Sequence, residues 1–186
     1  MDNAALTGGF ANPPIDASHV FRSVLQAMAR PGTIHDVSRV LPPAPISLAA
    51  GAVLLTLCDA TTRLHLTGDH DRDIVQDWLT FQTGAPLVPA NTADFVLGTW
   101  DAIELDALQI GTSEYPDRSA TVIVELSELT ASGATLRGPG IQDTASLNLP
   151  DLSAFQSNQA LFPLGLDFIF TCGTQLAALP RSTRVS

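Results

Sequence analysis

Lysine is absent from this sequence of 186 residues, in which all nine basic side chains are arginine. A Walker A loop uses a lysine on the β- and γ-phosphates, a protein kinase needs a lysine on a strand, and pyridoxal phosphate enzymes hold their cofactor as a Schiff base on a lysine. The sequence therefore excludes the ordinary form of all three mechanisms. We expect a protein that uses no cofactor.

Charged side chains are also scarce, at 15% of the sequence against a typical ~25%. The 19 acidic residues outnumber the 9 basic ones, which gives a net charge of −10 at pH 7. Proteins that bind nucleic acid or an anionic membrane need a basic face, so we expect neither partner. Few ionic groups and a mean hydropathy of +0.21 instead predict exposed apolar patches, and hence at least a homodimer.

Cysteine occurs only twice, as Cys58 and Cys172, each directly after an apolar run. Because the sequence shows no signal-peptide pattern, we interpret them as two buried free thiols in a reducing cytoplasm; a disulfide or a reactive pair is the alternative. The longest apolar stretch, Ile46 to Cys58, is shorter than the ~20 residues that span a bilayer. It predicts a buried core helix.

Strand and helix patterns alternate along the chain, which favours a single layered α/β domain over residues 1–186. Residues 1–15 are rich in Gly, Pro and Asn and predict an extended N-terminal arm. Further helices are predicted at 46–58, 71–82 and 152–161. Strands are predicted at 33–37, 63–67, 95–97, 120–126, 135–137, 168–172 and 175–179.

The first helix is predicted from Asp16, its expected N-cap, to the stop at Pro31 and Gly32. Its apolar residues recur at the spacing of one helical face, and they are Ala17, Val20, Phe21, Val24, Leu25 and Met28.

The most polar cluster, Gly68 to Asp73, has two interpretations. Carboxylates and imidazole are metal ligands, but their spacing here fits no known metal motif, so we favour a solvated turn that caps a helix and expect no metal. His19, His35 and His65 are each more consistent with a structural role than with a catalytic one. Cys58 precedes Asp59, whose carboxylate raises a thiol pKa, so a thiol nucleophile is not predicted.

Two segments are candidates for binding an anion. Arg137, Gly138 and Gly140 follow a strand, where backbone N–H groups and a guanidinium could hold an anion; the alternative is a glycine turn that ends the strand, because Pro139 lacks an N–H. Arg22 projects from a helix whose other face is apolar, and is either a ligand residue or an interface arginine.

Several motifs, in order along the chain, resemble the PhnH family of bacterial phosphonate metabolism. They are Phe21-Arg22 through Ala27-Met28 to Pro31-Gly32; Phe81-Gln82-Thr83 with Ala85-Pro86; Gly111-Thr112, Pro116 and Ala120-Thr121; Leu136, Gly138, Gly140 and Ile141; Phe162-Pro163-Leu164-Gly165-Leu166-Asp167; Thr171-Cys172-Gly173; and Pro180-Arg181-Ser182-Thr183. The resemblance runs from about Phe10 to the end of the chain. Position 82 is often histidine in the family and is Gln82 here, which argues against a required proton transfer at this position.

The resemblance implies a subunit of the carbon–phosphorus lyase core complex, which couples an alkylphosphonate to the ribose of a nucleoside triphosphate before the C–P bond is cleaved. It also implies a three-layer α/β/α sandwich with a mixed, mostly parallel sheet, similar to the large domain of pyridoxal phosphate-dependent transferases but without the cofactor. The implied partners are a second copy of the chain, the small subunit PhnG and other core subunits.

Two functional classes remain open. One is a structural or ligand-binding subunit, and the other is an enzyme with its own small-ligand site at the dimer interface. We favour the first, because no acid–base pair or oriented nucleophile can be recognised, and the catalytic residues remain unknown. For a phosphonate or nucleotide ligand the expected binding residues are Arg22, Arg137, Gly138, Gly140 and Arg181. Gly165 is expected in a tight turn with positive φ.

Overall fold

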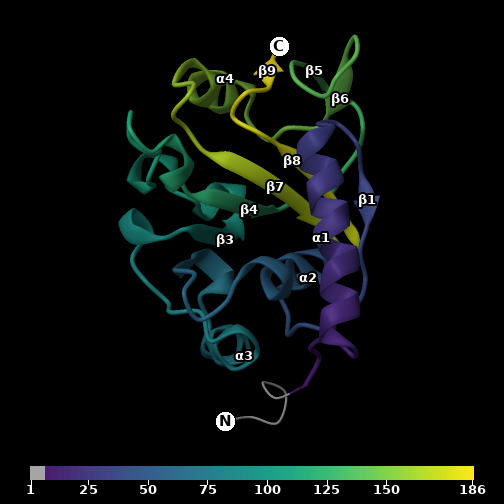
Figure 1. Ribbon diagram of the computed structural model, residues 1–186, viewed down its shortest axis with the longest axis vertical. Helices are drawn as coiled ribbons and strands as arrows, with labels where there is room; N and C mark the ends of the chain where they lie inside the picture. Colours follow the sequence, from purple (N-terminus) through teal and green to yellow (C-terminus); the bar gives the residue numbers. More distant parts are fainter. Residues whose placement is uncertain (1–6) are drawn as a thin grey trace.

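The structure, a computed structural model that describes residues 7–186, is organised around a six-stranded sheet (Figure 1). The sheet order is β1-β8-β7-β4-β3-β2. Its strands are β1 (His35–Asp36), β2 (Leu64–Leu66), β3 (Phe95–Thr99), β4 (Thr121–Glu125), β7 (Asp167–Cys172) and β8 (Gln175–Leu179). Strands β2, β3, β4 and β7 pair in parallel, whereas β8 pairs antiparallel with both β7 and β1. The predicted α/β class with a mixed, mostly parallel sheet is confirmed.

Both faces of the sheet are covered. Side chains alternate along each strand, so Ile123 and Ile169 pack against one layer while Val122 and Phe168 pack against the other. The first layer contains α1 (Pro13–Ala29), α2 (Leu48–Leu57) and α3 (Asp73–Thr83). The second contains α4 (Leu152–Ala160) and a small antiparallel sheet in the order β6-β5-β9, made of β5 (Ala134–Arg137), β6 (Ala145–Leu147) and β9 (Arg184–Val185).

The start of the first helix corrects the prediction for the N-terminal arm. Helix α1 begins at Pro13, a residue suited to a first helical turn, so residues 13–15 belong to the helix. Asp16 is therefore not the N-cap but lies buried in the first turn, where it accepts a hydrogen bond from the backbone N–H of Asn12. That bond and the nearby Arg39 lower the pKa of Asp16. The predicted arm also includes residues 1–6, which lie outside the described part of the chain.

The apolar run at 46–58 folds as predicted into a buried helix, α2. The backbone N–H of Ala50 donates to the side chain of Ser47, the N-cap, and Ala49 to Leu54 are buried. Cys58 and Cys172 are both free, and Cys58 is buried whereas Cys172 is half-buried. Burial, and then the nearby Asp59 and Asp94 carboxylates, raise the pKa of Cys58 to about 12, which makes this thiol a poor nucleophile.

The remaining predicted helices and strands are present with shifted ends. Helix α3 begins at Asp73, and its C-cap is Gly84 in the left-handed region. Strands β6 and β9, each of only two or three residues, were not predicted because so short a segment shows no recognisable alternation. Within residues 7–186, no helix combines the length and apolar character needed to span a membrane.

The turn before β7 depends on Gly165, which has the positive φ, 113°, that the sequence predicted. A Cβ at this position would lie 2.9 Å from the side-chain oxygen of Asn158. The Asn158 amide cannot move away easily, because it accepts from the Leu166 backbone N–H at 2.7 Å and donates to the Leu166 carbonyl at 2.9 Å.

We therefore expect Gly165→Val to lower the free energy of unfolding by more than ~2 kcal/mol, from backbone strain together with the clash. The matched control is Gly173→Val, because Gly173 also has a positive φ, 58°, but a Cβ there would meet nothing within 4 Å. Chemical denaturation should place Gly165→Val at least ~1 kcal/mol below the control. Equal losses would contradict the role assigned to Asn158.

Candidate functional site

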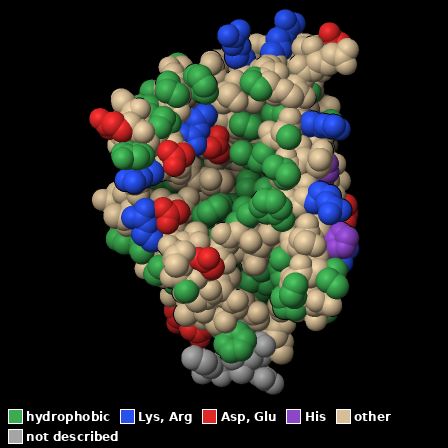
Figure 2. Space-filling model, viewed as in Figure 1, with side chains coloured by type: hydrophobic (Ala, Val, Ile, Leu, Met, Phe, Trp, Pro, Cys, Tyr) green, Lys and Arg blue, Asp and Glu red, His purple; other side chains and the backbone are tan. Residues whose placement is uncertain are grey.

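A cleft of about 480 Å³ lies where β7 begins and β8 ends, beside the C-terminal end of α1. Five stretches that are distant in sequence line it, at 28–29, 116–117, 139–140, 162–167 and 180–182. Figure 2 shows the hollow in the middle of this face, with hydrophobic side chains along one side and charged side chains on the other. Most of the motifs that resemble the PhnH family therefore meet in one place.

An ion pair between Arg181 and Asp167 lines the cleft. The guanidinium donates from Nη2 to Oδ2 at 2.5 Å and from Nε to both carboxylate oxygens at 3.2 Å, while Nη1 donates to the Pro116 carbonyl at 2.6 Å. The Arg181 backbone N–H also donates to Asp167 Oδ1 at 2.8 Å. Of the five guanidinium N–H groups, two are left for a ligand. The side chains are only 14% and 17% exposed, so the pair is largely shielded from water.

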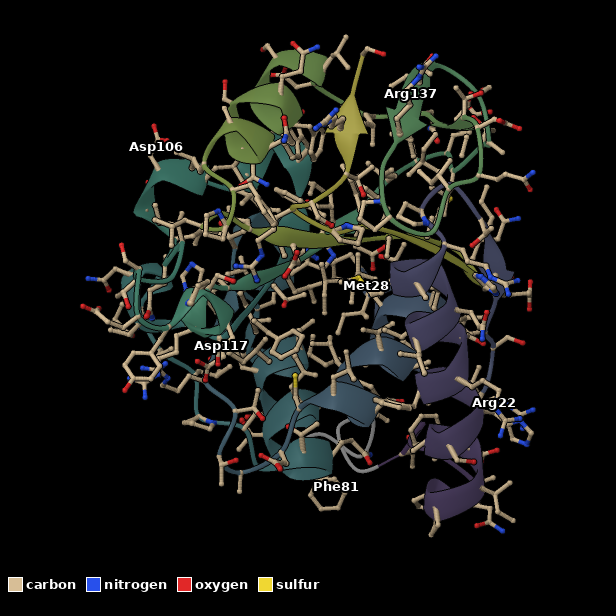
Figure 3. All side chains as sticks on the ribbon, turned by 45° about the horizontal axis from the view of Figure 1, so that its top comes forward. Arg22, Met28, Phe81, Asp106, Asp117 and Arg137 are labelled. Carbon is tan, nitrogen blue, oxygen red and sulfur yellow. The ribbon has the colours of Figure 1, made fainter. Side chains whose placement is uncertain are left out.

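Prolines and a closely packed glycine shape the walls of the cleft. Four prolines line it, and each fixes one backbone φ. Gly140, with a φ of 80°, packs directly on the carbonyl oxygen of Ala29 at the end of α1, where a Cβ would not fit. Met28 on α1 and Asp117 on the opposite wall lie on the two sides of the cleft (Figure 3). Backbone restrictions on several of its lining stretches therefore help to define the shape of the cleft.

The five predicted ligand-binding residues do not form one site. Gly140 and Arg181 both line the cleft. Gly138 lies beside it, since a Cβ there would be 3.3 Å from the Ser182 carbonyl oxygen. Arg137 and Arg22 lie elsewhere, on β5 and on α1.

Arg137 lies directly opposite Arg184 in the antiparallel pair of β5 and β9. Both residues are exposed, whereas the neighbouring pair, Leu136 and Val185, is buried on the other face. Like charges directly opposite each other disfavour strand pairing. Sequence reasoning missed Arg184, because β9 was not recognised as a strand.

Arg22 lines a second hollow of about 400 Å³ together with His19 and Arg39. The Arg39 guanidinium donates to Asp16 at 2.9 Å, whereas the Arg22 side chain makes no ion pair or hydrogen bond among residues 7–186. Asp36 also lines this hollow, so its charge is mixed.

The sequence predicts structural roles for the histidines. The His35 ring hydrogen-bonds with the Thr33 hydroxyl at 3.0 Å, and the His65 ring hydrogen-bonds with the Val88 carbonyl at 2.9 Å. No three His, Cys, Asp or Glu side chains within residues 7–186 come together in a way that could hold a metal ion.

The predicted solvated turn at 68–73 is exposed except at His70, which is buried. Residues Gly68–His70 form a short 3₁₀ turn after β2, and the His70 ring is buried with neither nitrogen hydrogen-bonded. Its Nε2 lies 3.9 Å from Oε1 of Glu125 at the end of β4, too far for a hydrogen bond. Glu125 accepts from the backbone N–H of Ser47 at 2.7 Å and from the hydroxyl of Thr171 at 3.1 Å. His70 and Glu125 are distant in the sequence, and the fold places these two titratable groups side by side in the interior.

Comparison with known proteins agrees with the cleft motifs. The family model for the bacterial phosphonate metabolism protein PhnH matches residues 8–186. The chain belongs to the PhnH family. It is 38% identical over 191 residues to the α-D-ribose 1-methylphosphonate 5-triphosphate synthase subunit PhnH of Rhizobium meliloti (strain 1021), covering 96% of this chain and 94% of that one. It is 31% identical over 179 residues to a protein of Stutzerimonas stutzeri named "Putative C-P lyase subunit protein HtxG". The match covers 89% of this chain and 84% of that one.

For this PhnH family member, breaking the Arg181–Asp167 pair should be costly. Asp167→Asn leaves a shielded guanidinium without its counter-charge, and we expect the free energy of unfolding to fall by about 3 kcal/mol. Removing both charges, in Asp167→Asn with Arg181→Gln, should recover part of that loss in a double-mutant cycle.

The control is Arg72→Gln, since Arg72 and Asp69 form an ion pair whose side chains are 56% and 76% exposed. It should change stability by less than ~1 kcal/mol. A loss for Asp167→Asn no larger than the control's would contradict a structural ion pair.

The buried pair at His70 predicts two opposite pH dependences. Burial lowers the pKa of His70, so the unfolded chain takes up the proton first and stability is lost as the pH falls below about 6.5, with a slope of at most ~1.4 kcal/mol per pH unit. Burial raises the pKa of Glu125, so the folded chain takes up this proton first and stability is gained as the pH falls through that raised value toward 4.5.

His70→Leu should remove the first dependence and Glu125→Gln the second. Urea denaturation from about pH 7.5 to about pH 5 would measure both, and the comparison of slopes is independent of any overall loss of stability. A His70→Leu slope equal to that of the wild type would rule out a buried, neutral His70.

Proposed function

We propose that this chain is a subunit of an α-D-ribose 1-methylphosphonate 5-triphosphate synthase in phosphonate catabolism. It binds and positions a ligand but does not catalyse the reaction itself. The relative from Rhizobium meliloti bears the name of such a subunit and aligns with nearly all of both chains. The observation that carries the binding role is the cleft, where the family motifs meet around an ion pair that is already satisfied.

The chemistry of the cleft supports binding. Arg181 donates three of its N–H groups to Asp167 and Pro116, and a guanidinium offers hydrogen-bond donors only. A group in this state can attract an oxyanion through its two remaining N–H groups, but it does not shuttle protons. Gly140 and Ser182 line the same cleft. A phosphonate or nucleotide is the ligand that this donor set suits.

The other predicted features enter the proposal as expectations. We propose that the fold is related to the large domain of pyridoxal phosphate-dependent transferases, and a chain without lysine cannot form the internal aldimine of those enzymes. We propose a homodimer that also binds PhnG and other core subunits. The free cysteines suit the reducing cytoplasm, where we place the protein.

Reconstitution with the other core subunits tests this function. With methylphosphonate and a nucleoside triphosphate as substrates, leaving out this chain should abolish formation of the ribose phosphonate, while the chain alone should show no turnover. Phe162→Ser should reduce product formation, because the Phe162 ring is 57% exposed at the cleft. Leu152→Ser is the control, since Leu152 is 40% exposed on α4 and does not line the cleft.

Two outcomes would contradict the proposal. Full activity without this chain would remove it from the synthase. Turnover by the isolated chain would instead support the alternative of an enzyme with its own small-ligand site at the dimer interface.

A further inference from the structure

Helix α1 carries two apolar stripes, and only one of them is buried. Val20, Val24 and Ala27 are spaced four and three residues apart and pack into the core at 0–6% exposure. Phe21 and Leu25 repeat the same spacing one residue later, and they remain 51% and 53% exposed. A helix that packs against one layer needs a single stripe, so among residues 7–186 the second stripe has no packing partner.

The second stripe borders a hollow. Phe21 and Leu25 rise beside a depression of about 520 Å³, which is also lined by three small side chains, Ala17 and Ser18 of α1 and Thr56 of α2. One surface thus presents both large side chains that protrude and a space lined by small ones. This is the arrangement by which helices interlock when knobs enter holes.

The stripe leads into the cleft. The next residue in its spacing is Met28, which lines the cleft at the C-terminal end of α1. Figure 2 shows hydrophobic side chains gathered along α1 and beside the central hollow. We call Phe21, Leu25 and Met28 the apolar band; the first two are more than half exposed, and Met28 is partly buried where it lines the cleft.

Charge distinguishes this band from the rest of the surface. The chain has a net charge of −10, so two copies repel each other wherever their acidic residues face. The only acidic residue on α1 is Asp16, which is buried and paired with Arg39. Beside the stripe lies Arg22, which has no ionic partner within the described residues. Helix α1 itself therefore brings no exposed carboxylate to such a contact, and the nearby Asp36 lies in the hollow that Arg22 and Arg39 also line.

We propose that a second copy of this chain packs its own α1 antiparallel against this band, so that Phe21 and Leu25 of each copy enter the hollow of the other. The inference rests on the homodimer of the proposed function and assigns its interface. A two-fold interface must be self-complementary, and this band offers the protruding residue and the receiving hollow on the same surface.

Light scattering and sedimentation of the isolated chain test the interface. The wild type should be a dimer at micromolar concentration. Phe21→Ser and Leu25→Ser should each raise the dimer dissociation constant by about tenfold or more. Leu152→Ser is the matched control, because this leucine is 40% exposed on α4, in the layer on the opposite face of the sheet, and it should leave the dimer unchanged. Thermal melts of each variant would verify that the fold is retained.

Cross-linking tests the antiparallel geometry directly. Phe21→Cys should join two chains through a short bismaleimide, because an antiparallel pair in which Leu25 enters the hollow lined by Ala17 and Ser18 places position 21 beside its own copy. Leu152→Cys should not, and the wild type sets the background from Cys58 and Cys172.

Each result supports or overturns the proposal. A dimer that Phe21→Ser and Leu25→Ser weaken, together with selective cross-linking at position 21, supports it. A monomeric wild type overturns it, as does a dimer that neither substitution weakens. A monomer that uses the same two residues to bind another core subunit overturns it in favour of a heterologous partner. Because the reconstitution assay scores product formation, loss of the synthase role and loss of this interface are separate results.

Discussion

Burial of β4 and β7 on both faces is the constraint on which the rest of the structure depends. These strands lie in the middle of the sheet, and their central residues, such as Ile123 and Phe170, have no exposed surface. Polar side chains are therefore restricted to the strand ends. Asp167 stands at the start of β7, and Glu125 and Thr171 stand near the ends of β4 and β7. The same two strands thus support a polar cluster at each end.

The polar groups of the two clusters differ in their hydrogen-bond partners. At the amino ends of the parallel strands, Asp167 is fully engaged by Arg181, and the cleft beside it is open. At the carboxyl ends, Glu125 lies under the start of α2, which donates the Ser47 N–H, and the His70 ring beside it has no hydrogen bond. Open α/β sheets usually bind ligands at the carboxyl ends. Here α2 covers that end, and the candidate site lies at the opposite one.

The low content of charged residues has its clearest structural consequence at α1, which leaves apolar side chains exposed. A layer that covers a narrow sheet can bury only one stripe of a helix, so Phe21 and Leu25 remain outside. In a chain with 15% charged residues, such surplus apolar surface is better explained by assembly than by packing within the subunit. The band and the cleft share Met28, which links assembly to the candidate site.

The sequence by itself determined the elements with strong local signals. Alternation of apolar residues marked β4, a long apolar run marked α2, and Gly165 marked a turn with positive φ, because each signal arises from the conformational preference of neighbouring residues. The order of motifs was also sufficient for the family.

Contacts between distant residues were decided only by the tertiary structure. The sequence showed Arg181 and Arg137 as similar anion-binding candidates, but strand pairing placed one against Asp167 and the other opposite Arg184. It showed one apolar face on α1, which packing divided into a buried and an exposed stripe. His70 read as solvated because burial depends on which elements cover a turn, and a single sequence carries no signal for that.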